Sequence, residues 1–213
     1  MQQFSLKSLL LSSLLVAFIS SCSPTLCYKK KGTEFVSEAN IQPIVSRKNS
    51  LLYKANIKLY NKYFSGIILL KQTDSISSHL VFVTELGMKM FDYEIKNNQF
   101  KLIYVFEPLN KPKVLKLLES DFKLVLLQNL LNKEAVIYGK ENSLIYKVVD
   151  QKQKSFYYAN KSTKTVSQIK VKGALFCKEK VNYVYNDSLS ATQIKLKHNG
   201  IIRLKIELNN ISK

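Results

Sequence analysis

The chain has 213 residues and a formal net charge of +18, with 33 Lys and Arg against 15 Asp and Glu. Apolar residues make up 46% of it, whereas Gly and Pro number only 6 and 4, which excludes an intrinsically disordered chain. The length fits one folded domain, because a single hydrophobic core can still grow at this size. A positive charge of this size is typical of proteins that bind nucleic acid. The N-terminal export signal described next argues against a nucleic-acid partner.

An apolar run from Leu9 to Ile19 follows Lys7 and ends at Ser20-Ser21-Cys22. A charged start, a short apolar middle and small residues before a cleavage point are typical of an export signal. The sequence therefore predicts a signal peptide over residues 1–21, with Cys22 as the first mature residue. The pattern resembles the lipobox of bacterial lipoproteins, which implies that Cys22 is acylated, for example with palmitate, and tethers the protein to a bilayer. An ordinary secretory signal and a short membrane anchor are the alternatives.

Residues 22–34 carry Pro, Gly and charges without a period, and we expect a lipidated tether there. The basic run at residues 28–31 lies where it can touch lipid headgroups. After export, Cys27 and Cys177 either pair in a disulfide or stay free, with Cys177 as a small buried apolar residue. The spacing from Cys22 to Cys27 lacks the CxxC form, so neither a metal site nor a cofactor is predicted.

From Leu51 to Leu59 apolar and polar residues alternate with the period of a half-buried strand. Residues 63–71 form a second predicted strand, in which Gly66 marks a bend or a bulge. Three further strands are expected as a meander, over residues 79–86, 88–96 and 100–106.

A helix is predicted over residues 113–131, because apolar residues recur there at steps of three and four and Pro112 suits the first helical position. Ser120 or Asp121 is expected to cap a restart midway. Strand patterns then return over residues 135–138, 143–149, 155–159, 165–172, 181–185, 189–197 and 201–208. The predicted fold is one mainly β domain that extends over residues 35–213 and contains an α insertion. It is a curled antiparallel sheet, or incomplete β-barrel, of about 11 strands with the helix after the fifth strand.

Basic residues are scattered singly along the predicted strands, and we expect them to form a solvated outer face, with attraction to anionic lipid surfaces as the functional alternative. They are Lys54, Lys58, Lys170, Lys172, Lys195, Lys197, Arg203 and Lys205.

Residues 82–90, Phe-Val-Thr-Glu-Leu-Gly-Met-Lys-Met, look like the strand, Leu-Gly, strand connection of the LolA/LolB family of lipoprotein carriers and receptors. The resemblance extends over roughly residues 51–208 and rests also on the tether and on the helix inserted in a meander. It implies that acyl chains of a lipoprotein enter the hollow of a half barrel. It also implies that Leu86 and Met88 form a loop that touches membrane or cargo. The alternative is that both are core residues flanking a turn.

The residues expected to line the hollow are Ile57, Leu59, Leu80, Phe82, Phe100, Leu102, Tyr104, Ile202 and Leu204. An acyl chain would bind there by leaving water, at about 25 cal/mol per Å² of apolar surface buried. The alternative is a fully packed core without a cavity.

No catalytic motif accompanies His79 or His198, the two histidines of the chain, and we do not expect an enzyme. Each histidine lies at a predicted strand end and is expected to be a surface or capped residue. The expected partners are acyl chains, the bilayer and a periplasmic carrier protein, and the protein is expected to be a monomer without a nucleic-acid partner. Ser23 after Cys22 favours, by resemblance to other lipoproteins, the outer membrane facing the periplasm. A scaffold lipoprotein that binds another envelope protein along a sheet edge is the other class considered.

Overall fold

The computed structural model describes residues 24–44, 50–73, 77–97, 99–150, 153–173, 176–200 and 202–212. The predicted signal peptide and Cys22 lie outside these residues. Six strands precede the helical segment: β1 (Lys29–Val36), β2 (Leu51–Leu59), β3 (Lys62–Gln72), β4 (Ser77–Thr84), β5 (Lys89–Lys96) and β6 (Gln99–Val105). The 3-10 helix η1 (Glu107–Leu109) and the helix α2 (Pro112–Val125) follow. Seven strands complete the described fold: β7 (Lys133–Lys140), β8 (Ser143–Asp150), β9 (Gln153–Asn160), β10 (Val166–Lys172), β11 (Cys177–Tyr185), β12 (Ala191–Asn199) and β13 (Arg203–Asn210).

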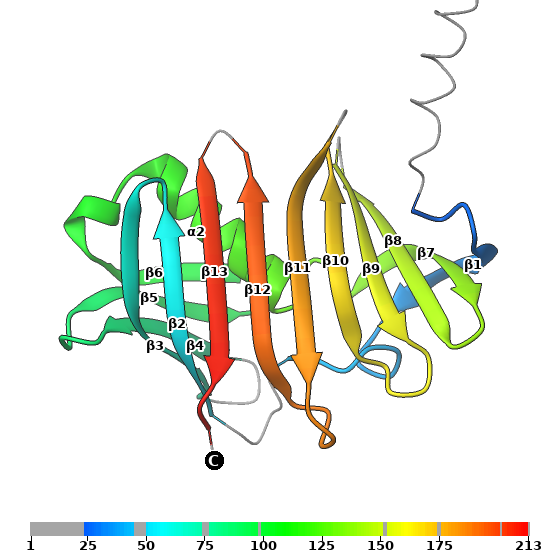
Figure 1. The fold of residues 1–213 in the computed structure, drawn as a ribbon, viewed down its shortest axis with the longest axis horizontal. Coiled ribbons are helices and arrows are strands. Elements are labelled where there is room, and N and C mark those ends of the chain that lie inside the picture. Colours follow the sequence, from blue (N-terminus) through cyan, green and yellow to red (C-terminus); the bar gives the residue numbers. More distant parts are fainter. Residues whose placement is uncertain are drawn as a thin grey trace, which may run out of the picture.

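All of these strands belong to one curled antiparallel sheet (Figure 1). Their order is β1-β7-β8-β9-β10-β11-β12-β13-β2-β3-β4-β5-β6. The C-terminal strand β13 pairs with β2, so the two halves of the chain form one continuous sheet. In Figure 1 the sheet bends so that β5 and β6 pass behind β2 and β13. The sheet is open, with β1 and β6 as its edges.

The order of the strands explains where the helix lies. The strand before it, β6, forms one edge of the sheet, whereas the strand after it, β7, is next to the opposite edge. The connection between them must therefore cross one side of the sheet, and it crosses the concave side (Figure 1), which we call the inner face; the convex side is the outer face. Helix α2 makes this crossing behind the strands in Figure 1 and lies closest to β12. Its apolar side, including Val114, Leu118 and Phe122, is buried there.

The predicted helix is confirmed in kind, but its extent was wrong. Pro112 does occupy the first turn, where its missing N–H removes no helical hydrogen bond. The helix ends at Val125 rather than at residue 131, and Leu127 adopts a positive φ of 61°, which breaks the helical hydrogen-bond pattern. Asp121 does not cap a restart, because it is a buried residue within a continuous helix.

The mainly β fold with one helical insertion is confirmed, but the strand count and the helix position were wrong. The sheet has 13 strands rather than about 11, and the helix follows the sixth strand rather than the fifth. The difference before the helix is β1, which pairs with β7 and occupies part of the predicted tether. Its sequence, Lys-Lys-Lys-Gly-Thr-Glu-Phe-Val, is mostly exposed and lacks the apolar alternation of an inner strand.

Gly66 sits in a regular register within β3, where Ala55 and Thr84 lie opposite it on the neighbouring strands. A Cβ atom at this position would lie 2.0 Å from the carbonyl oxygen of Val83 and 2.7 Å from the Cα atom of Thr84. Glycine is therefore required by the close approach of β4, and the expected bend at this point is a tight strand contact.

We expect Gly66→Ala to destabilise the protein by more than about 2 kcal/mol, because overpacking against backbone atoms cannot be relieved by a side-chain movement. Urea unfolding followed by circular dichroism measures the change. Gly32→Ala is the matched control, because no atom lies within 4 Å of the added Cβ in β1. Equal stability of the two variants would contradict the close approach of β4 to β3.

Candidate functional site

The inner face of the sheet carries an unbroken row of apolar residues in register across nine strands. Each member lies opposite the next on the neighbouring strand: Ile137, Tyr146, Tyr157, Ile169, Val181, Leu196, Ile206, Ile57 and Phe64. All except Phe64 are buried, and Phe64 packs against the same core. Together with the other buried core residues of the sheet, the row forms one apolar layer beneath α2, which we call the inner layer.

Most of the predicted lining residues belong to this inner layer. Those that are buried in the core are Ile57, Leu59, Leu80, Phe82 and Leu204. Phe100 and Ile202 are partly buried and pack against it. Buried residues of α2 and of residues 126–130 belong to the same hydrophobic cluster as these lining residues. The predicted lining therefore lies in the core that α2 covers.

Two predicted lining residues, Leu102 and Tyr104, are exposed on the edge strand β6. A register shift between β5 and β6 places Tyr104 opposite Asp92, while Leu102 lies opposite Tyr93. The bulge residue Ile103 is exposed as well. The assignment of Tyr104 to the inner face was wrong, because one extra residue reverses the side to which the following side chains point.

Burial keeps the tyrosines of the inner layer uncharged. Burial raises the pKa of Tyr53 to about 12, and its hydroxyl donates to the carbonyl oxygen of Ala191 at 3.0 Å. Burial also raises the pKa of Tyr93 to about 12, with the nearby Glu119 carboxylate adding to the rise. Tyr183 donates to the carbonyl oxygen of Val125 at 2.9 Å and so ties the end of α2 to the sheet.

The turn between β4 and β5 presents two apolar side chains to solvent. Leu86 is 92% exposed and Met88 is 44% exposed. The turn is held by hydrogen bonds from Thr84 N to Met88 O and from Gly87 N to Thr84 O, both 2.9 Å. Gly87 has a φ of 81°, which glycine adopts without strain. The alternative that Leu86 and Met88 are core residues is therefore wrong, since a well-formed turn holds both in water.

The outer face carries a row of five lysines on five adjacent strands. In the register of the sheet, Lys170, Lys180, Lys197, Lys205 and Lys58 lie opposite one another in that order, from β10 to β2. None of the five forms an ion pair with a described residue, whereas the neighbouring Lys195 does so with Glu207 at 2.7 Å. Like charges directly opposite one another destabilise a sheet, so we expect this row to lower the free energy of unfolding. The sequence predicted a basic outer face but not this alignment, which depends on the register.

Two shallow depressions lie over this lysine row. One has a volume of about 370 Å³ and is lined by Asn56, Lys58, Tyr63, Asn182, Lys195, Leu196, Lys197, Lys205, Ile206 and Glu207. The other, of about 380 Å³, is lined by Lys58, Tyr60, Asn61, Arg203 and Lys205. Both therefore lie away from the predicted acyl-chain hollow, on the opposite side of the sheet.

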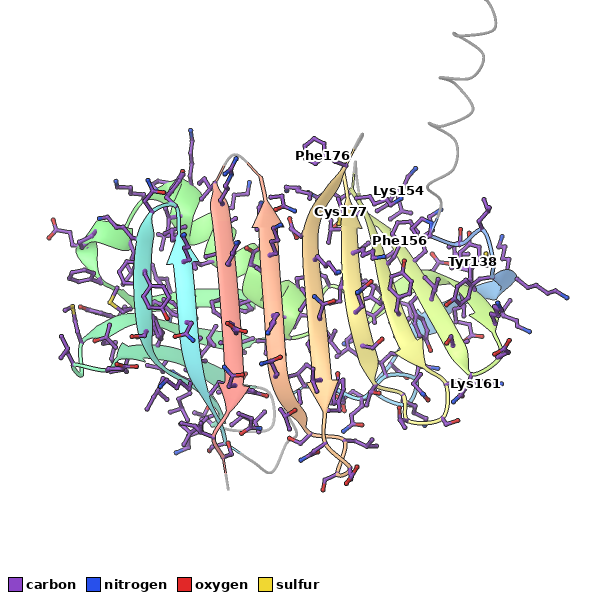
Figure 2. All side chains as sticks on the ribbon, in the orientation of Figure 1. Tyr138, Lys154, Phe156, Lys161, Phe176 and Cys177 are labelled. Carbon is purple, nitrogen blue, oxygen red and sulfur yellow. The ribbon has the colours of Figure 1, made fainter. Side chains whose placement is uncertain are left out.

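One aromatic side chain, Phe156, is buried on the outer face of β7–β10, which Figure 2 views from the front with Phe156 and Tyr138 labelled. Phe156 is only 4% exposed although it lies opposite Lys147 and Lys170 in the outer row. The ammonium group of Lys170 is 5.1 Å from the ring centre of Tyr158, a cation–π distance. Long lysine stems thus cover apolar surface here while their charges stay in water.

The two described cysteines are unpaired, and each of the two histidines lies beside an aspartate. Cys27 and Cys177 are both free thiols, Cys27 exposed and Cys177 half-buried. His79 is partly buried and lies 3.1 Å from Asp92 on the outer face. His198 is buried under α2 beside Asp121, 77 positions earlier in the chain, so its expected surface position was wrong. A partner so distant in sequence gives no spacing signal.

Within the described part of the chain, no helix combines the length and the apolar character needed to cross a bilayer.

Neither a protein-family model nor a curated protein matches the chain. Three solved structures are similar to it. A LolA superfamily protein from Nitrosomonas europaea has 9% identity and a TM-score of 0.45, over 79% of this chain and 87% of that chain. A DUF1329 family protein from Desulfovibrio piger has 11% identity and a TM-score of 0.41, over 78% and 85%. A domain described as an outer membrane lipoprotein-sorting protein from Vibrio parahaemolyticus has 7% identity and a TM-score of 0.42, over 82% and 87%. The first of the three is thus named as a LolA superfamily protein.

We expect Lys197→Glu to stabilise the protein by about 0.5–2 kcal/mol, because it replaces two cross-strand repulsions, with Lys180 and Lys205, by two attractions of roughly 0.2–1 kcal/mol each. Urea unfolding at low and high salt measures the effect, which should shrink as salt screens the charges. Lys161→Glu makes the same change of net charge in an exposed turn and is the control. A Lys197→Glu protein no more stable than this control would show that the row carries no repulsion.

Proposed function

We propose that this protein is a non-enzymatic envelope lipoprotein that binds acyl chains of lipids or lipoproteins and helps transfer them at the outer membrane. In this proposal Cys22 carries the lipid anchor and the β4–β5 turn contacts the bilayer or the cargo. The observation that carries it is the exposure of Leu86 and Met88 on an ordered turn. Apolar side chains held in water by a well-formed turn are typical of a surface that is covered by a lipid or a protein.

The inner layer supplies the second part of the proposal. It is continuous, apolar and uncharged apart from one buried polar cluster, and α2 and the residues that follow it cover it. The contacts between Phe122 of α2 and the sheet, such as that with Phe91 at 5.6 Å between ring centres, bury apolar surface and involve no hydrogen bond between the two side chains. An acyl chain can replace such contacts at similar free energy, since burial of apolar surface scales with area rather than with partner identity. In this proposal α2 moves when an acyl chain enters the interior.

The expected monomeric state, a periplasmic partner that delivers cargo and the absence of nucleic acid as a partner belong to the same proposal. No catalytic step is part of it. Exchange of an acyl chain between two apolar environments breaks no covalent bond, so burial of apolar surface is sufficient to drive it.

We expect the mature chain, residues 22–213, to bind vesicles of phosphatidylethanolamine and phosphatidylglycerol, and the double substitution Leu86→Asp, Met88→Asp to weaken that binding by at least about 10-fold, since burying one such side chain contributes roughly 1.5–3 kcal/mol. Vesicle flotation measures the bound fraction, with the lipid anchor removed by Cys22→Ser in every sample. Val184→Asp, at a 52% exposed apolar residue on the outer face of β11, is the control. Unchanged flotation of the double variant would contradict a membrane role for the turn.

The edge strand β6 favours a second candidate function, a scaffold that binds another envelope protein. Leu102, Ile103 and Tyr104 are exposed on this strand, which has only β5 as a neighbour in the sheet. An exposed apolar edge is a template for strand addition. Ile103→Pro should then abolish capture of the partner while leaving vesicle flotation unchanged, because proline removes a backbone donor from the edge.

A further inference from the structure

Three titratable side chains from three different elements meet beneath α2. Asp121 comes from the helix, Glu179 from the start of β11 and His198 from the end of β12. Glu179 and His198 lie opposite each other on the inner face, within a layer that is otherwise apolar. Their side chains are 0%, 4% and 6% exposed, in the order Asp121, Glu179, His198. The proposed acyl-chain function, which involves the inner layer and the β4–β5 turn, gives this cluster no role.

The distances in the cluster match those between the ligands of one metal ion. His198 Nδ1 is 3.0 Å from Asp121 Oδ1 and 3.6 Å from Glu179 Oε1. One ligand atom from each residue lies within 4.8 Å of the others. Nitrogen and oxygen ligands of a tetrahedral zinc ion, at about 2.0–2.2 Å from the metal, lie roughly 3.3–3.5 Å apart. The two contacts of His198 bracket that separation.

One acceptor in the cluster is unpartnered. Asp121 Oδ2 is fully buried and has no hydrogen-bond partner in the part of the chain that the structure describes. A buried carboxylate oxygen without a donor has lost its hydration without compensation, so a ligand bound at this atom would stabilise the folded state. Burial raises the pKa of Asp121, against the opposing effect of its hydrogen bond with His198. A cation between the three residues would satisfy the oxygen and compensate both carboxylates.

We propose that Asp121, Glu179 and His198 bind one divalent transition-metal ion of the zinc type, which links α2 to β11 and β12. His198 supplies Nδ1, the carboxylates supply oxygen, and Asp121 Oδ2 or a water completes the coordination. One imidazole with two carboxylates suits Zn²⁺ better than Mg²⁺ or Ca²⁺, which favour all-oxygen sites. This site departs from the expectation of no metal, which rested on cysteine spacing alone, and it does not depend on the proposed acyl-chain function.

The hairpin between β12 and β13 makes room for the imidazole. A Cβ atom on Gly200 would lie 2.5 Å from His198 Nε2. Gly200→Ala should therefore shift the imidazole and weaken metal binding without removing a ligand. This gives a positioning variant in addition to the ligand substitutions.

The test is a titration of the full chain, freed of metal by EDTA and dialysis, with Zn²⁺ in a calorimeter. We expect one ion per chain and a higher melting temperature with zinc than without it, since a ligand that binds only the folded state stabilises that state. His198→Gln and Glu179→Gln should each lower the affinity by more than about 100-fold, because even outer-sphere partners of a metal are worth roughly 10- to 100-fold.

His79→Gln is the matched control, because it removes the other histidine of the chain, which also pairs with an aspartate but has Lys89 rather than a second carboxylate beside it. Cys177→Ser excludes a thiolate ligand. Where a ligand variant fails to fold, the visible spectrum of the wild type loaded with Co²⁺ tests the proposal instead. We expect a tetrahedral spectrum without a thiolate charge-transfer band. The proposal is overturned if the wild type binds no zinc, if His198→Gln binds it as tightly as His79→Gln does, or if the cobalt spectrum is octahedral or shows thiolate.

Discussion

The register of the sheet is the constraint on which the rest of the structure depends. Ile206 on β13 lies opposite Ile57 on β2 and points inward, whereas the next pair, Lys205 and Lys58, points outward. A slip of one residue in any strand would move its apolar side chains to water and its lysines beneath α2. The strength of the apolar alternation therefore decides the pairing, even where it forces lysines into line on the outer face.

The same constraint gives the helix its place. Because β13 joins β2, one strand that flanks the helical segment, β6, is an edge of the sheet and the other, β7, lies next to the opposite edge, and the chain connects them across the concave side (Figure 1). The apolar layer, the helix that covers it and the Asp121–Glu179–His198 cluster at their contact are consequences of one topology. The polar cluster is placed where three elements converge, so that one small group of residues is able to control how firmly the helix is held.

Features of local origin were predictable from the sequence. The alternation at Leu51–Leu59 and the helical period after Pro112 gave the mainly β fold with its insertion, because both depend on neighbours along the chain. Strand β1 was missed because an edge strand rich in lysine lacks an apolar period. The exposure of Tyr104 depended on a bulge, and the pairing of Asp121 with His198 and the alignment of the lysines depended on long-range register. None of these leaves a local pattern.

The account of function rests on whether an acyl chain reaches the inner layer of the folded protein. The most direct measurement replaces Phe82, which is buried on the inner face, with photoreactive benzoylphenylalanine and irradiates the protein with radiolabelled phospholipid vesicles; Tyr63, exposed on the outer face, is replaced in a parallel sample. The account predicts a lipid adduct at position 82 that competing fatty acid removes, with little or none at position 63. Adducts confined to position 63, or equal at the two positions and insensitive to fatty acid, would contradict it.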